Sequence, residues 1–151
     1  MRRRKKLQPL VVVAGLIIIG IFIFFLVVNV FQSRNYEKAV DSFYEYEQEG
    51  DFGSAWELFH PQMKKRFSKN AYVTERSHIY MSHYGVNTFT YKIVDDKKIK
   101  SWKMEKSKTF QNVHRFTIQQ IFNSKFGVFK VEQEVFVVKE KGEWKIAWEF
   151  R

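Results

Sequence analysis

The longest apolar stretch of the chain lies near its N-terminus. Residues Leu10–Phe31 carry no charge, and they follow five basic residues, Arg2, Arg3, Arg4, Lys5 and Lys6. A helix of this length is roughly 33 Å long, which is enough to cross a hydrocarbon core of about 30 Å. Basic flanks are retained on the cytoplasmic side. The pattern predicts a single-pass cell-membrane protein with a cytoplasmic stub at 1–9, a transmembrane helix at 10–31 and an extracytoplasmic domain at 32–151.

A cleaved secretory signal is the alternative interpretation of this segment. Signal sequences have apolar regions of about 7–15 residues that end at a small-x-small cleavage site. Here the apolar run is longer, and it continues into Asn29-Val30-Phe31-Gln32-Ser33-Arg34, which contains no such site. The sequence therefore favours an uncleaved anchor.

Helical spacing follows the apolar segment. An apolar stripe with the i, i+3, i+4, i+7 pattern predicts a helix that ends at Gly50 and includes Tyr36, Ala39, Val40, Phe43 and Tyr44. Asp51 can cap a second helix, and Pro61 can start a short third turn. A further helical segment is predicted from Thr74 to Tyr84, with Gly85 as its C-terminal cap.

After Gly85 the apolar period changes to two, which is typical of strands with one buried face. The alternating segments centre on Tyr91, Phe116–Phe122, Phe129–Val137 and Trp144–Phe150, and a weaker edge strand is predicted at Ile99–Met104. The connections are too short for parallel crossovers, so the strands are predicted to pair antiparallel. Helices followed by an antiparallel sheet define an α+β fold.

Charge and composition narrow the classes of function. The segment after residue 31 holds 21 of the 26 basic residues and all 16 acidic ones, and its basic residues are spread along the chain. A nucleic-acid-binding domain would gather them on one element, so no nucleic-acid partner is expected. Cysteine is absent, which excludes disulfides, thiol catalysis and thiolate metal sites.

Three segments resemble the nuclear-transport-factor-2-like superfamily. They are Gly50-Asp51-Phe52, Tyr72-Val73-Thr74-Glu75-Arg76 and the last strand, Gly142-Glu143-Trp144-Lys145-Ile146-Ala147-Trp148. More narrowly, the chain is similar to the membrane-proximal N-terminal domain of methicillin-resistance-type penicillin-binding transpeptidases. This resemblance implies a cone of about three helices packed on a curved antiparallel sheet, with a pocket at its open end. It also implies a spacer or docking role.

Catalytic motifs are missing from the sequence. Neither S-x-x-K nor K-T-G occurs, so no transpeptidase activity is carried over from the resemblance. His78 and His83 are five residues apart, which on an α-helix turns them about 140° away from each other, so no shared metal site is expected. We expect no enzyme, no cofactor and no metal.

One face of the predicted sheet carries the candidate pocket. Its residues would be mostly aromatic with two amides as polar groups, a composition that suits a small apolar ligand. The candidates are Tyr91, His114, Phe116, Gln120, Gln133, Trp144 and Trp148. A hairpin turn at Phe126-Gly127 would place Gln120 opposite Gln133, whereas a turn one residue earlier would pair Gln120 with Val131. Gly127 favours the first register, because glycine adopts positive φ without strain.

The sequence leaves three functional hypotheses. The first is a non-catalytic, membrane-anchored interaction or docking module of a bacterial cell envelope, related to the cell wall, that contacts the lipid bilayer and an envelope protein partner or a second copy of itself. The second is a protein that binds a small apolar ligand in the cone pocket. The third is a scaffold subunit of a secretion or conjugation apparatus.

Overall fold

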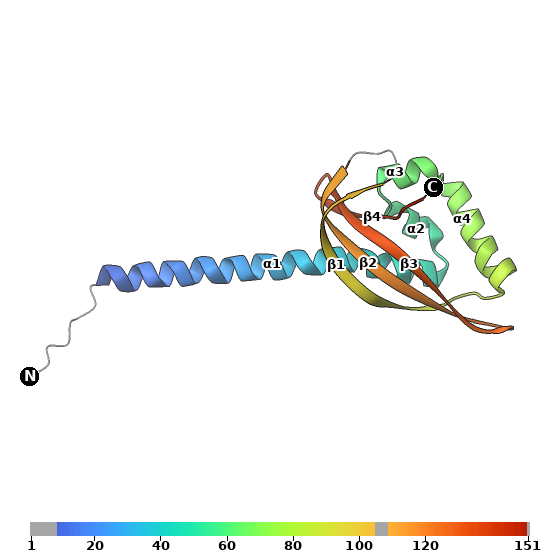
Figure 1. Cartoon of the computed structure of the whole chain (residues 1–151), viewed down its shortest axis with the longest axis horizontal. Helices are drawn as coiled ribbons and strands as arrows, with labels where there is room; N and C mark the ends of the chain where they lie inside the picture. Colours follow the sequence, from blue (N-terminus) through green and yellow to red (C-terminus); the bar gives the residue numbers. More distant parts are fainter. Residues whose placement is uncertain (1–8, 105–108, 151) are drawn as a thin grey trace, which may run out of the picture. The chain divides into compact units, whose positions relative to one another are not determined.

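The computed structural model describes residues 9–104 and 109–150, and the chain divides into two compact units, Met1–Asn35 and Tyr36–Arg151. Helix α1, Pro9–Glu49, belongs to both units. Its residues 9–35 are the described part of the first unit, and its residues 36–49 are the first element of the second unit. The second unit continues with helices and then a four-stranded antiparallel sheet, so the predicted α+β class is confirmed (Figure 1).

The first unit contains a helix that is long and apolar enough to cross a membrane. The segment Val11–Val28 has a mean hydropathy of 3.4, and none of it is buried by the rest of the chain. A signal sequence would meet the same criteria of length and composition. The apolar helix is therefore confirmed, and its role as an anchor stays a prediction. The residues expected to orient it, Arg2, Arg3, Arg4, Lys5 and Lys6, lie outside the described residues.

Local capping sets the boundaries of the next helices. Helix α1 ends before Gly50, as predicted, and α2 spans Phe52–Glu57. The Asp51 carboxylate accepts a hydrogen bond from the Ser54 N–H at 3.0 Å, which satisfies a free donor at the start of α2. Helix α3, Pro61–Arg66, begins at a proline, which has no N–H to leave unpaired.

The third predicted helical segment starts earlier than its apolar pattern indicated. Helix α4 spans Lys69–His78, because the Ser68 hydroxyl accepts a hydrogen bond from the Ala71 N–H at 3.3 Å and caps the helix there. The helix then continues as a π-helix, η1, at Ile79–Tyr84. Gly85 ends it with φ of 65°, a left-handed conformation that glycine adopts without steric cost.

The sheet has the order β1-β2-β3-β4, with strands β1 (Thr90–Lys103), β2 (Thr109–Ser124), β3 (Gly127–Glu140) and β4 (Glu143–Ala147). The separate strand predicted at Ile99–Met104 is wrong: Ile99–Lys103 is the second half of β1. A register shift between Ile93 and Asp95 divides the apolar alternation of β1 into two parts, which explains the error. As predicted, this segment lies at an edge of the sheet.

The predicted register of the β2–β3 hairpin is also wrong. Ser124 pairs with Gly127, so Gln120 pairs with Val131 and Gln133 pairs with Ile118. The Ser124 hydroxyl accepts a hydrogen bond from the Phe126 N–H at 3.1 Å and donates one to the Gly127 carbonyl at 3.0 Å. This side-chain bonding places the turn at Lys125-Phe126, one residue earlier than the glycine suggested.

The outer edge of β4 is covered by the connection between α2 and α3. The Ile146 N–H donates to the Leu58 carbonyl at 2.9 Å, and the His60 N–H donates to the Ile146 carbonyl at 2.8 Å. These two bonds form a short parallel bridge between Phe59 and Ile146. The bridge satisfies backbone groups that an uncovered edge would expose for pairing with another chain.

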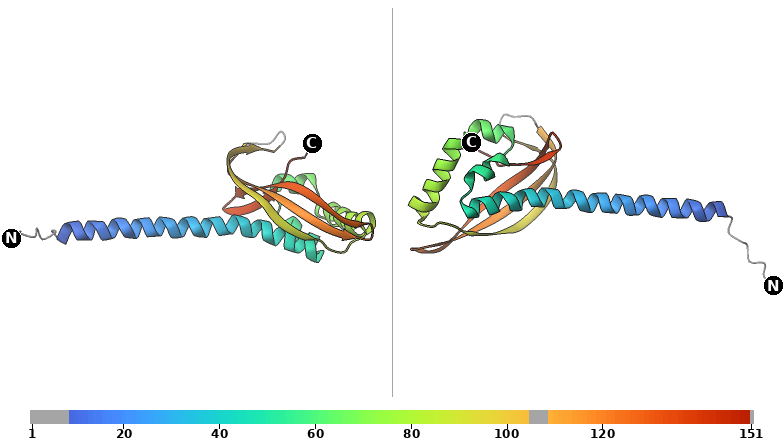
Figure 2. Two further views of the ribbon diagram at one scale, coloured as in Figure 1. Left: turned by 60° about the horizontal axis from the view of Figure 1, so that its bottom comes forward. Right: turned by 180° about the vertical axis from the view of Figure 1, so that it is seen from behind.

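The core of the second unit lies between the sheet and the helices. Figures 1 and 2 show α2, α3, α4 and the end of α1 on the same face of the sheet. Side chains from this part of α1 are completely buried, including Val40, Phe43 and Tyr44. They pack with equally buried residues of the α2–α3 connection and of the strands, among them Phe59, Phe116 and Ile146.

Candidate functional site

The inner face of the sheet, where a pocket is predicted, is occupied by α1. The ring of Tyr91 lies 5.1 Å from that of Tyr44, and its hydroxyl donates to the Asp41 carboxylate at 3.3 Å. The ring of His114 stacks on that of Tyr36 at 3.6 Å between centroids. Helix α1 therefore contacts two of the predicted pocket residues directly.

The remaining candidates are also engaged in packing. Phe116 is completely buried, and Gln120 donates a hydrogen bond to the Tyr80 hydroxyl at 3.3 Å. Trp144 contacts His114 edge-on at 5.7 Å, and Trp148 packs edge-on against Phe59 at 4.9 Å. Gln133 is half-buried and does not lie opposite Gln120. The two amides are thus diagonal neighbours on one face of the sheet and are not directly opposite each other, as the predicted register required.

His114 lies in a packed environment, against the rings of Tyr36 and Trp144. Burial and the nearby charge of Lys98 lower its pKa, so the imidazole is neutral at neutral pH. The closest carboxylate oxygen described for it is that of Asp96, at 4.0 Å, which is beyond hydrogen-bond distance. A stacked, neutral imidazole fits a packing role.

The most concentrated polar cluster of the domain surrounds Glu47 on α1. Glu47 is completely buried, and it forms an ion pair with Arg76 of α4, whose Nε donates to Oε1 at 3.0 Å and whose Nη2 donates to Oε2. Tyr72 also donates its hydroxyl to Oε1, and Tyr80 donates its hydroxyl to Oε2 at 2.7 Å. Gln120 extends the cluster to the sheet through Tyr80.

The geometry of this cluster indicates a structural role. A carboxylate has about four lone-pair sites, and four donors already occupy those of Glu47. Burial and the charge of Glu47 raise the pKa of both tyrosines, so both stay protonated and donate. Burial alone would lower the pKa of Arg76, but the combined effect of Glu47, Tyr72 and Tyr80 raises it, and the guanidinium stays charged. Glu47 has no free oxygen for a substrate.

The clefts on the surface of the described residues include two small ones. One has a volume of about 260 Å³ and is mostly apolar; the other has about 230 Å³ and a charged rim. Ligand pockets usually have about 300–1,000 Å³. None of the seven predicted pocket residues lines either of these clefts. The first is lined by Gly50, Phe52, Val73, Ser77, Tyr80, Met81 and Asn87. The second is lined by Phe59, Pro61, Lys64, Glu140, Lys141, Glu143 and Lys145.

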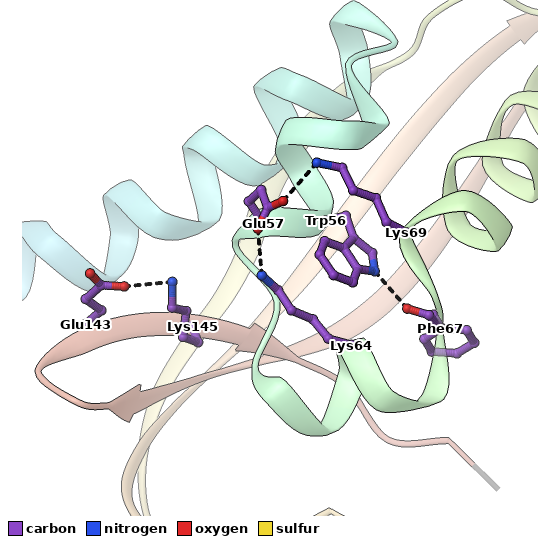
Figure 3. A network of polar contacts seen from close by, with 7 residues as sticks. All are labelled: Trp56, Glu57, Lys64, Phe67, Lys69, Glu143 and Lys145. Carbon is purple, nitrogen blue, oxygen red and sulfur yellow. Dashed lines mark hydrogen bonds and ion pairs between the residues drawn. The ribbon is translucent and has the colours of Figure 1, made fainter.

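A patch of cations on aromatic rings lies at the corner between α2 and α3. We define the Trp56 patch as Trp56, Lys64, Lys65, Arg66, Phe67, Lys69 and Phe150. Trp56 is fixed by a hydrogen bond from its indole N–H to the Phe67 carbonyl at 2.7 Å (Figure 3). The ammonium groups of Lys64 and Lys69 lie 4.3 Å and 5.7 Å from the indole centre.

The charges of this patch are only partly compensated. Glu57 accepts hydrogen bonds from Lys64 and Lys69 at 2.8 Å each, and these bonds lower its pKa to about 2 (Figure 3). Arg66 lies over the rings of Phe67 and Phe150 at 5.5 Å and 5.8 Å. The segment from Pro61 to Ala71 contains four basic residues and no acidic one. The patch is therefore a positively charged surface with partly exposed aromatic rings.

Sequence reasoning missed both of these arrangements. Glu47 continues the apolar stripe of its helix, since it stands four residues after Phe43 and seven after Val40. A charged residue at a core position signals a buried partner. The Lys64-Lys65-Arg66 run was visible, but its proximity to Trp56 depends on the turn at Pro61.

A scan of protein-family models finds none that matches this chain, and a search of curated proteins finds no relative.

Proposed function

We propose that this chain is a non-catalytic, membrane-anchored interaction module on the outer face of a bacterial membrane. The observation that carries the proposal is the filled inner face of the sheet. Helix α1 places Val40, Phe43 and Tyr44 where a ligand would bind, and the one fully buried carboxylate among the described residues has all its acceptor sites occupied. A domain of this kind has its outer surface available for binding.

The proposed anchor is the apolar segment of α1. Its length suits a bilayer, and the basic residues before it favour a cytoplasmic N-terminus. The antiparallel sheet with helices on one face supports the proposed likeness to nuclear-transport-factor-2-like domains. If the domain is of this type, its role is that of a spacer or docking element of the cell envelope.

Cysteine labelling tests this topology, because the native chain contains no cysteine. Phe126 is 84% exposed at the tip of the β2–β3 hairpin, so the variant Phe126→Cys presents a thiol to solvent. We expect a membrane-impermeant maleimide to label it in intact spheroplasts. The matched variant Arg3→Cys, in the basic stub, should react only after the membrane is permeabilised. The reverse pattern would refute an extracytoplasmic domain.

The proposed contact surface is the Trp56 patch, and the proposed partner is an acidic segment of another envelope protein. Cations that lie over aromatic rings attract carboxylates while the rings supply apolar contact area. Lys65 and Arg66 are exposed, and neither lies in the ion pairs of Glu57. These two residues therefore offer charge that Glu57 does not compensate, and Arg66 presents it from above the rings of Phe67 and Phe150.

Charge reversal tests this surface. We expect the double variant Lys65→Glu/Arg66→Glu to reduce partner capture after cross-linking in intact cells at least about tenfold, because like charges replace an attraction across the interface. The control is Lys92→Glu/Lys100→Glu, an equal change of charge on exposed positions of β1. Equal capture by the two double variants would exclude the Trp56 patch as the contact surface.

Two other hypotheses are ligand binding in the cone pocket and a scaffold role in a secretion or conjugation apparatus. The observed register weakens the ligand-binding hypothesis, because Gln120 does not lie opposite Gln133 and instead donates a hydrogen bond to the Tyr80 hydroxyl. Self-association, expected of a scaffold subunit, is tested by the sedimentation of the full chain in detergent.

A further inference from the structure

The π-helix brings together two histidines that an α-helix would separate. In a π-helix the backbone hydrogen bond runs from residue i+5 to residue i, so residues five apart lie one above the other. His78 is the last residue of α4, and His83 lies within η1, Ile79–Tyr84. Their ring centroids are 4.8 Å apart. The expectation that these side chains point away from each other is therefore wrong.

The distance between the rings matches that of two imidazoles on one metal ion. With a metal–nitrogen bond of about 2.0–2.1 Å, the centre of an imidazole ring lies roughly 3.2 Å from the ion. Two such rings are then separated by about 4.5 Å at a right angle and about 5.2 Å at the tetrahedral angle. The observed 4.8 Å lies between these values, but the two rings meet edge to face with their planes 85° apart, so a shared ion requires the rings to turn until a nitrogen of each faces it.

Both imidazoles are accessible, while the opposite side of the same helix is fixed in the core. His78 and His83 are exposed, whereas Tyr80, between them in the sequence, is buried and donates its hydroxyl to Glu47. The backbone that carries the pair is thus held by the Glu47 cluster, and the exposed rings can rotate to reach an ion at little cost. A preorganised backbone lowers the entropy lost on binding.

We propose that His78 and His83 form a two-histidine site for a divalent transition-metal ion such as Zn²⁺, Ni²⁺ or Cu²⁺. Imidazole nitrogen is a preferred ligand of these ions, whereas Mg²⁺ and Ca²⁺ prefer oxygen. Among the described residues, no group of three or more His, Asp or Glu side chains could hold a metal. The chain therefore supplies two ligands, and water fills the remaining positions, as in sites that leave coordination positions open.

Metal titration of the full chain tests the site. The protein is prepared in detergent without a polyhistidine tag, and Ni²⁺ and Zn²⁺ are titrated separately by calorimetry, with Mg²⁺ as the oxygen-preferring comparison. We expect one Ni²⁺ or Zn²⁺ per chain. His78→Gln and His83→Gln should each weaken binding about 10²-fold, because either change converts a chelate into a single ligand.

The control and the spectroscopic test make the outcome decisive. Ser82→Ala changes an exposed neighbour of His83 and should leave the affinity unchanged. With Cu²⁺, electron paramagnetic resonance should show coupling to two imidazole nitrogens in the native chain and to one in each histidine variant. Absence of saturable binding, or binding that neither histidine variant weakens, would overturn the proposal.

Discussion

Replacing Arg76 with alanine should lower the free energy of unfolding by about 3–5 kcal/mol. The Glu47 carboxylate is completely buried, and Arg76 is the cation that pairs with it among the described residues. The substitution removes this ion pair. An uncompensated charge in the core is strongly destabilising, because the attraction that offset its desolvation is lost. Urea denaturation of the full chain in detergent, followed by circular dichroism, measures the change.

Two further variants separate this effect from a simple loss of packing. In a protein that also carries Glu47→Gln, Arg76→Ala should lower the free energy of unfolding by clearly less, because no buried negative charge is left without a partner. The exposed ion pair of Lys69 with Glu57 provides the comparison: Lys69→Ala should change the free energy of unfolding by less than about 1 kcal/mol. Equal losses for Arg76→Ala in both backgrounds would contradict a charge-based role for Arg76.

The second large effect is expected at Phe43, where truncation to alanine should cost about 3–5 kcal/mol. Phe43 is completely buried, and its ring contacts those of Tyr44, Phe59 and Trp148. Removing a buried aromatic side chain loses transfer free energy and leaves a cavity that the core fills only in part. The same denaturation experiment measures the loss.

Trp148 supplies the comparison for this variant. The sequence placed Trp148 among the main inward residues of the sheet, but it is only half-buried and lies beyond the end of β4. Trp148→Ala should therefore cost less than Phe43→Ala. The opposite order would mean that the centre of the core lies nearer to the C-terminal strand than to α1.

Sequence patterns predicted those features that depend on neighbouring residues. The end of α1 at Gly50, the Asp51 cap and the start of α3 at Pro61 are local, and all three are confirmed. The start of α4 is also local, but the Ser68 cap was overlooked because the apolar stripe begins only later.

Predictions failed where two local signals competed or where the helix type changed. Gly127 was expected in the hairpin turn, yet the Ser124 hydroxyl stabilised the turn one residue earlier. The separation of His78 and His83 was calculated for an α-helix, and the π-helix altered it. The contacts of α1 with the candidate pocket residues Tyr91 and His114 depend on tertiary packing, which periodicity does not specify.

The bridge between Phe59 and Ile146 has a consequence for when the domain can fold. It joins the α2–α3 connection to the last strand, so the two partners are separated by most of the sequence of the domain. Contacts of such long sequence separation form late, because a large loop must close first. Under the proposed topology the chain leaves the cytoplasm with its C-terminal strand last. Residues 36–140 would therefore cross the membrane before β4 is available to complete the core and to cover the edge of the sheet with the α2–α3 connection.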